Sequence, residues 1–206
     1  YVGEQAAVGV LPDDRTILVD VFPNEVGDLR VGVISTFGRS FHLALWLTVR
    51  AELRRAGHEP PEGIVSNDGI LLRPGAVPIE AIVGAIERLG DGEIRGRLAE
   101  ELRDSPYFAL RFRRNAGRAL LLPRSQPGKR VPLWLQRLRS HDLLAYASEH
   151  PRFPIVAETH REILDDVLPI ALLERFVRRA AVGEARFAVR RGRSPSPFTG
   201  ALLLDF

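Results

Sequence analysis

Hydrophobic and polar positions alternate in several short runs in the first half of the chain. Residues 16–22 and 29–35 follow a two-residue period, and turn-forming residues at 23–28 separate them. We therefore expect an antiparallel pair of half-buried strands. Residues 63–67 and 69–73 are two further short runs with a turn between them. These four runs predict a sheet in the first half of the chain.

Helical periodicity replaces this alternation in the second half. Proline, glycine and polar residues separate the helical segments from one another, as expected at helix boundaries. In the first half the expected helices are 40–55 and 78–90. In the second half they are 93–104, 106–122, 132–148, 155–168 and 169–181, followed by a strand at 184–190 and a last helix after the turn at 194–197.

Together these elements predict an α+β fold, with an N-terminal mixed antiparallel sheet and two helices, followed by a mainly helical part with a short terminal strand. We expect residues 1–104 to form a sheet-containing subdomain and residues 105–206 a mainly helical, basic subdomain. The chain contains no Met, even at position 1, and both ends read as the interior of a longer polypeptide. The two parts are therefore expected to form one domain of a longer chain.

The composition excludes several classes of protein. The chain has no Cys, so disulfides, thiolate zinc sites and iron–sulfur clusters are ruled out. Its longest apolar runs are far shorter than the roughly 20 residues of a membrane-spanning helix, and no secretory signal is visible. We therefore expect a cytoplasmic protein without a membrane partner.

Charge is distributed unevenly along the chain, although the net charge is only +3. Residues 105–141 carry nine basic side chains and no acidic one, whereas residues 1–104 carry 11 basic and 17 acidic side chains. A long segment without carboxylates favours a polyanionic partner. The alternative is that these basic side chains pair with the acidic N-terminal half.

Motifs for nucleotide or metal chemistry are missing from the sequence. Gly128-Lys129 is followed by Arg130 and lacks the earlier glycine of a phosphate-binding loop. The five histidines have no metal-ligand spacing, and we expect them on the surface or in the core. Adjacent carboxylates such as Asp165 and Asp166 point in different directions on a helix, so they are poor acid–base pairs. Glu158 and Glu162 are expected to form surface ion pairs with Arg161.

The basic segment contains a regular pattern. Arg111, Arg114 and Arg118 are spaced i, i+3 and i+7, which places three guanidinium groups on one helix face. Phe108 and Phe112 are expected to pack in the core beside them. Trp134 has two alternatives: stacking on a nucleobase or anchoring its helix to the core. Further candidates for phosphate contacts are Arg124, Lys129, Arg130, Arg137 and Arg139.

An ordered set of motifs resembles the Lhr (large helicase-related) family of superfamily 2 DNA helicases, and specifically its C-terminal, DEAD/H-associated domain. The resemblance covers essentially the whole chain. Its motifs are residues 11–15 (LPDDR), 37–38 (FG), 67–70 (NDGI), 121–124 (LLPR), 127–130 (PGKR), 132–139 (PLWLQRLR), 153–159 (FPIVAET), 183–186 (GEAR) and 195–198 (PSPF).

The resemblance implies a noncatalytic domain that binds single-stranded nucleic acid within an ATP-dependent helicase. The parent protein would be an ATP hydrolase that uses ATP and Mg²⁺ in motor lobes outside this chain, with no cofactor in the chain itself. It would translocate 3′ to 5′ on single-stranded DNA, unwind duplexes including DNA/RNA hybrids, and act in DNA repair near the nucleoid. Other partners would be the motor lobes and a winged-helix module of the same polypeptide.

Two positions depart from the family pattern. Some members have a base-stacking Trp in the helix after the Phe-Gly turn, where this chain has Leu45, with Trp46 one position further on. One position rotates a helical side chain by about 100°, so Trp46 is either a stacking wedge or a core residue. The Pro-Ser-Pro-Phe motif precedes Thr199-Gly200 rather than a small residue and Arg.

Two rival hypotheses remain at this stage. In the first, the basic surface docks on acidic motor lobes of the same helicase and does not grip DNA directly. In the second, the chain is a free-standing hydrolase that uses scattered carboxylates such as Asp165. Charge reversal at Arg114 and Arg118 separates the docking hypothesis from DNA binding, because only DNA binding would be lost if these residues contact phosphates.

Overall fold

The computed structural model describes residues 2–90, 94–103, 105–122, 132–150 and 153–204. It divides into two compact units. Unit 1 consists of Tyr1–Arg97 together with Leu168–Phe206, and unit 2 is Leu98–Val167. Unit 1 thus takes in both ends of the chain, whereas the sequence suggested a single boundary after residue 104. The division into functional subdomains remains a prediction.

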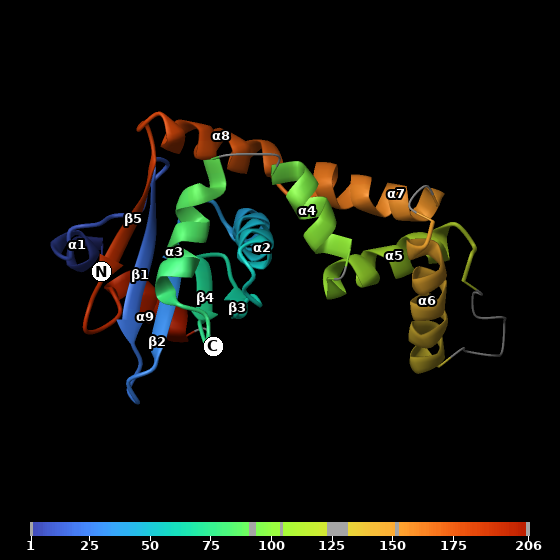
Figure 1. Cartoon of the computed structure of the whole chain (residues 1–206), viewed down its shortest axis with the longest axis horizontal. Helices are drawn as coiled ribbons and strands as arrows, with labels where there is room; N and C mark the ends of the chain where they lie inside the picture. Colours follow the sequence, from blue (N-terminus) through green and yellow to red (C-terminus); the bar gives the residue numbers. More distant parts are fainter. Residues whose placement is uncertain (1, 91–93, 104, 123–131, 151–152, 205–206) are drawn as a thin grey trace. The chain divides into compact units, whose positions relative to one another are not determined.

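Unit 1 is built on a five-stranded sheet with the strand order β3-β4-β2-β1-β5 (Figure 1). Strands β1 and β2 form the expected antiparallel pair, in which Val19 lies opposite Val33. Strand β5 runs parallel to β1, with Leu18 opposite Ala188. The strands are β1 (Thr16–Pro23), β2 (Leu29–Ile34), β3 (Glu62–Val65), β4 (Gly69–Arg73) and β5 (Arg186–Arg191).

This mixed sheet with its helices confirms the predicted α+β class. The strand near the C-terminus was also predicted, but its place at the sheet edge beside β1 was not. Its parallel pairing requires the chain to leave the sheet after β4 and return much later. Helix α1 (Val2–Ala7) was not predicted.

Helices cover both faces of the sheet. Consecutive strand residues point to opposite faces, so Leu71 and Leu72 of β4 mark the two sides. Helix α9 (Pro197–Leu204) contributes Leu202 to a buried cluster with Leu71 and Phe22. Helix α2 (Arg39–Arg55) covers the Leu72 side, where its Trp46 packs on Gly63. A Cβ at Gly63 would lie 2.7 Å from the Trp46 ring, so this contact requires glycine.

The remaining helices of unit 1 pack beside these two. Helix α3 (Ile79–Glu87) contacts α2 and β5, and the short helix η1 (Arg88–Gly90) continues it. Helix α8 (Ile170–Ala181) also contacts α2 and β5. Its Phe176 ring lies 5.3 Å from the ring of Phe187 on β5 and 6.4 Å from that of Phe41 on α2. These contacts form the larger apolar core of unit 1.

Unit 2 is helical, as expected for this part of the chain. Its elements are α5 (Pro106–Arg118), α6 (Leu133–Ser148), α7 (Pro154–Arg161) and η2 (Glu162–Val167), and α4 (Ile94–Arg103) spans the sequence boundary between the units. Helix α5 packs against α6 and α7, and α7 runs directly into the π-helical turn η2. Across the described ranges, no helix combines the length and apolar character needed to cross a membrane.

Candidate nucleic-acid interface

Helix α5 carries the arginine pattern, and its start is fixed by the local sequence. Ser105 caps the helix by accepting a hydrogen bond from the Phe108 amide at 3.1 Å, and Pro106 occupies the first turn, where its missing N–H costs nothing. Phe108 and Phe112 are almost completely buried. Their predicted place in the core is confirmed, and it fixes which face of α5 carries the arginines.

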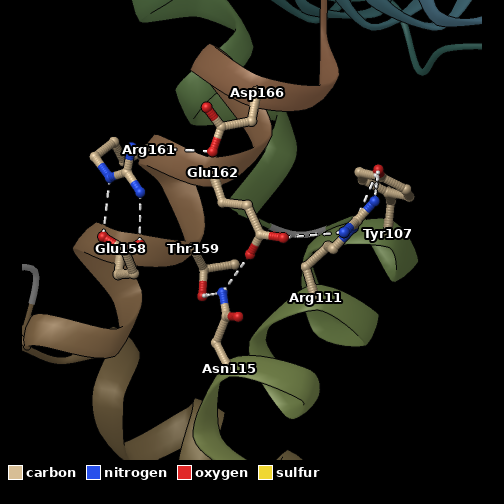
Figure 2. Close-up of polar contacts among 8 residues, drawn as sticks. All are labelled: Tyr107, Arg111, Asn115, Glu158, Thr159, Arg161, Glu162 and Asp166. Carbon is tan, nitrogen blue, oxygen red and sulfur yellow. Dashed lines mark hydrogen bonds and ion pairs between the residues drawn. The ribbon is translucent and has the colours of Figure 1, made fainter. Parts of the chain in front are cut away.

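Arg111 is part of a polar network within unit 2 (Figure 2). Its Nη1 donates to Glu162 Oε1 at 3.0 Å, and its Nε and Nη2 donate to the Tyr107 hydroxyl at 3.2 and 3.1 Å. The hydrogen bond with Tyr107 and the Glu162 charge both raise the pKa of Arg111. Arg111 is therefore held by protein partners, and its charge is largely compensated.

Asn115 extends the same network deeper into unit 2. Its side-chain amide donates to Glu162 Oε2 at 2.7 Å and to the Thr159 hydroxyl at 3.2 Å (Figure 2). Glu162 thus joins α5 to η2 through both carboxylate oxygens. The expectation that Glu162 forms a surface ion pair with Arg161 is wrong, because η2 turns its side chain toward α5. Glu158 does pair with Arg161, at 2.7 and 3.0 Å on the surface.

Arg114 and Arg118 differ from Arg111 because both are exposed to solvent. Arg118 lies close enough to Glu158 for its positive charge to help lower the pKa of that carboxyl, although the hydrogen bonds from Arg161 lower it more. Two exposed guanidinium groups one turn apart on a helix are each able to contact a phosphate. Of the three arginines on this face, these two are the best placed for an external anion.

Helix α6 presents a second exposed surface in unit 2. Trp134 is 66% exposed, so the alternative that it anchors the helix to the core is wrong. Arg137 and Leu138 follow at i+3 and i+4 on the same face, and both are exposed. Arg139 is also exposed, at another angle around the helix. A flat aromatic ring beside a cation is a combination found in single-strand binding surfaces.

The other predicted residues fall in different places. Arg124, Lys129 and Arg130 lie outside the described residues. Trp46 is in unit 1 and only 4% exposed, with its indole against Gly63. Of its two alternatives, the structure places Trp46 in the core, where base stacking would require this contact to open. Leu138 and Tyr107 were not singled out from the sequence, although the i, i+4 spacing of Trp134 and Leu138 is a detectable signal.

The described residues offer little for metal or acid–base chemistry. They contain no group of three His, Asp or Glu side chains placed to hold a metal ion. Among the histidines, His42 is fully buried and His160 packs on Phe108 with the ring centroids 4.5 Å apart. The expected core or surface placement of the histidines holds for these two. The exposed guanidinium groups of Arg114, Arg118 and Arg137 are able to bind an anion noncovalently.

Comparisons with known proteins show which proteins this chain is similar to. The chain is 38% identical over 206 residues to the Lhr helicase/probable uracil glycosylase of Mycolicibacterium smegmatis, covering 98% of this chain and 14% of that protein. It is 34% identical over 203 residues to the Lhr helicase/uracil glycosylase of Escherichia coli, covering 98% of this chain and 13% of that protein. The chain thus spans about one seventh of these relatives.

Structural comparison gives the same result. The structure of the Mycobacterium smegmatis helicase Lhr bound to ssDNA and AMP-PNP matches with a TM-score of 0.81 and 37% identity, over 98% of this chain and 26% of that one. A family model described as "DEAD/H associated" matches residues 11–199. The predicted resemblance to the Lhr helicases is confirmed, and the chain belongs to the DEAD/H associated family.

Proposed function

We propose that this chain is the single-strand-binding, helicase-associated part of an Lhr-type ATP-dependent DNA helicase. The observation that carries the proposal is the likeness, over nearly the whole chain, to a helicase Lhr bound to ssDNA. The exposed basic side chains of unit 2 supply a physical means of binding. In this proposal the chain has no catalytic residue of its own.

The strand would be held mainly through its phosphates. Arg114, Arg118, Arg137 and Arg139 are exposed on α5 and α6, and Arg124, Lys129 and Arg130 belong to the same basic segment of the sequence. Arg111 would contribute less because Glu162 neutralises it. Phosphate contacts carry little sequence information, so this surface would grip any sequence, which suits a strand that moves through the protein.

The remaining functions belong to other parts of the proposed parent protein. Three of the relatives carry the name ATP-dependent helicase Lhr-Core, which supports ATP use by the parent. The residues of this chain do not fit an ATP–Mg²⁺ site because the sequence lacks a phosphate-binding loop. We further propose that the parent protein translocates 3′ to 5′, unwinds DNA/RNA hybrids and acts in DNA repair. Its partner module would be a winged helix of the same polypeptide, and its location would be cytoplasmic and nucleoid-associated.

Salt dependence of binding tests the proposal directly. Fluorescence anisotropy of the 206-residue protein with labelled single-stranded DNA would be measured across a series of salt concentrations. If about five phosphates are neutralised, log K falls against log salt with a slope near −3.5. Binding that is insensitive to salt contradicts the proposal.

Charge reversal of exposed arginines tests whether the DNA-binding surface lies on α5. The double variant Arg114→Glu/Arg118→Glu should weaken binding at low salt and flatten the salt slope. A matched control is Arg15→Glu/Arg178→Glu, which changes the net charge equally at two exposed arginines of unit 1. Equal loss of affinity in both variants would show a general charge effect rather than a binding surface on α5.

A second candidate function is docking on other domains of the same helicase. Exposed apolar side chains on α6 favour it: Leu133 is 73% exposed, Leu138 50% and Tyr146 60%. Exposed apolar groups of this size commonly mark contacts with another protein surface. If this function holds, Leu133→Ser/Leu138→Ser would weaken association with separately produced motor lobes and leave the affinity for single-stranded DNA unchanged.

A further inference from the structure

Unit 1 contains a cavity of about 400 Å³ beside α9 and the end of β2. The end of β2 and the residues after it form one side of the cavity. The turn before β4 forms a second side, and α9 forms a third. Its lining includes Ile34, Ser35, Thr36, Asp68, Phe198 and Ala201. All these residues belong to unit 1, and none of them was assigned to the basic surface of unit 2.

The chemistry of this lining selects a class of ligand. Among the residues that the structure describes, no Arg, Lys or His lines the cavity, so it does not suit a phosphate. Phe198, Ile34 and Ala201 supply apolar surface, and Phe198 supplies an aromatic ring. Asp68 supplies a carboxylate that accepts hydrogen bonds. A largely apolar pocket with a few polar groups is typical of a small-molecule site, and this set suits an uncharged, flat heterocycle with N–H donors.

The polar side of the cavity is held rigidly by a buried histidine. His42 is fully buried, and its Nδ1 lies 3.0 Å from the Ser66 carbonyl oxygen. Because a carbonyl only accepts, Nδ1 carries the proton, and Nε2 accepts from the Ser35 hydroxyl at 2.7 Å. The Ser66 hydroxyl in turn accepts from the Asp68 amide at 3.1 Å. His42 therefore fixes the two segments that carry Ser35 and Asp68.

The aromatic side is held by two more buried polar side chains. The Phe198 amide donates to Gln5 Oε1 at 2.9 Å, and the Ser196 amide donates to Asp20 Oδ2 at 2.7 Å. Gln5 and Asp20 are both fully buried. Three buried polar side chains, those of His42, Gln5 and Asp20, thus position the lining of one cavity. A site already held in its binding conformation loses less conformational entropy when a ligand binds.

We infer that this cavity binds one unstacked nucleobase of a single strand, with the base against Phe198 and a base amino group donating to the Asp68 carboxylate. The inference rests on the proposed function, because only a bound single strand presents unstacked bases to unit 1. Cytosine, adenine and guanine carry an exocyclic amino group and thymine does not. The pocket therefore prefers amino-bearing bases to thymine.

Three oligonucleotides of about 12 nucleotides, a length within the range of known single-strand sites, separate base binding from phosphate binding. They are oligo-dC, oligo-dT and a fully abasic strand, each measured by anisotropy with the 206-residue protein. We expect dC to bind at least about fivefold more tightly than the abasic strand, as one base–aromatic stack provides, and also more tightly than dT.

Two conservative variants test the named residues. Phe198 packs on the buried cluster that contains Leu202. Phe198→Leu keeps an apolar side chain there but removes the aromatic face. This variant should therefore lower the ratio of the affinity for oligo-dC to the affinity for the abasic strand. Asp68→Asn should reduce the preference for dC over dT. The matched control is Asp28→Asn, because Asp28 is another exposed carboxylate in a turn of unit 1. Thermal unfolding would verify that every variant is folded.

The outcomes separate the two proposals. If dC, dT and the abasic strand bind equally tightly, the pocket inference is overturned while the phosphate-binding function stands. If none of them binds, the proposed function itself fails. If Trp134→Ala removes the advantage of dC and Phe198→Leu does not, base recognition belongs to α6, and the pocket inference is again overturned.

Discussion

Arg111 and Glu162 form an ion pair within unit 2, with Nη1 3.0 Å from Oε1 and both side chains mostly buried. The pair divides the arginines of α5 into two kinds. Arg111 faces η2 and joins two helices, whereas Arg114 and Arg118 face solvent. Regular i, i+3, i+7 spacing therefore does not give three equivalent phosphate contacts.

Glu162→Gln should lower the free energy of unfolding of unit 2 by about 1–3 kcal/mol, because Arg111 and Asn115 would both lose a charged acceptor. Urea denaturation would measure the loss. The affinity for single-stranded DNA should change little, since the exposed arginines remain. The converse variant, Arg114→Ala, should weaken DNA binding and leave the unfolding midpoint nearly unchanged. A fall in DNA affinity as large in Arg111→Ala as in Arg114→Ala would contradict this division.

The two tryptophans should behave in opposite ways. Trp46→Ala should cost about 3–5 kcal/mol of stability, because it empties a buried site between α2 and the sheet. Trp134→Ala removes an exposed ring and should change stability by about 0.5 kcal/mol or less. Trp134→Ala should instead weaken binding to single-stranded DNA. Denaturation and anisotropy on the same two samples would test both statements, and a stable Trp46→Ala variant with lost DNA binding would reverse the assignment.

Local patterns predicted the elements well but not their long-range partners. The alternation at 16–22 and 29–35 and the prolines at 106 and 132 correspond closely to β1, β2, α5 and α6. By contrast, the pairing of β5 with β1 joins residues about 170 positions apart, and nothing in either run specifies it. Helix α1 was missed because six residues are too few for a clear period.

The same limit applies to the candidate site. Helical spacing placed Arg111, Arg114 and Arg118 on one face, but only the fold shows that η2 brings Glu162 to Arg111. Trp134 and Trp46 each had two possible environments because a tryptophan suits both core and surface. The cavity at Phe198 was not predicted, since its lining comes from four separate stretches of the chain.

Asp20 is a fully buried carboxylate whose removal should be costly. It accepts from Arg190 Nη1 at 2.6 Å and from the Ser196 amide at 2.7 Å. Asp20→Asn leaves Arg190 without its counter-charge, and breaking a buried pair in this way costs about 3–5 kcal/mol. Hydrogen exchange should also become faster in α9, which follows Ser196. Unchanged exchange in α9 would mean that Asp20 does not hold this segment.

Two histidines should make stability depend on pH. Burial lowers the pKa of His42, and burial together with the positive charge of Arg103 lowers the pKa of His160. In the unfolded chain both groups have the ordinary pKa of about 6.5. As pH falls through that value, the unfolded state binds protons that the folded state does not. The contribution of these two histidines to stability is therefore fully present well above pH 6.5 and is lost as pH falls below it, by up to about 1.4 kcal/mol per pH unit for each histidine.

Urea denaturation between about pH 7.5 and about pH 5.5 covers this range before most carboxylates titrate. His160→Phe should reduce the pH dependence without a large loss of stability, because a phenyl ring retains the contact with Phe108 and removes a buried Nδ1 that has no hydrogen-bond partner among the described residues. His42→Asn should also reduce it, at a cost in stability from the lost Ser35 and Ser66 contacts. An equally steep pH dependence in His160→Phe and the unaltered protein would show that His160 titrates normally in the folded state.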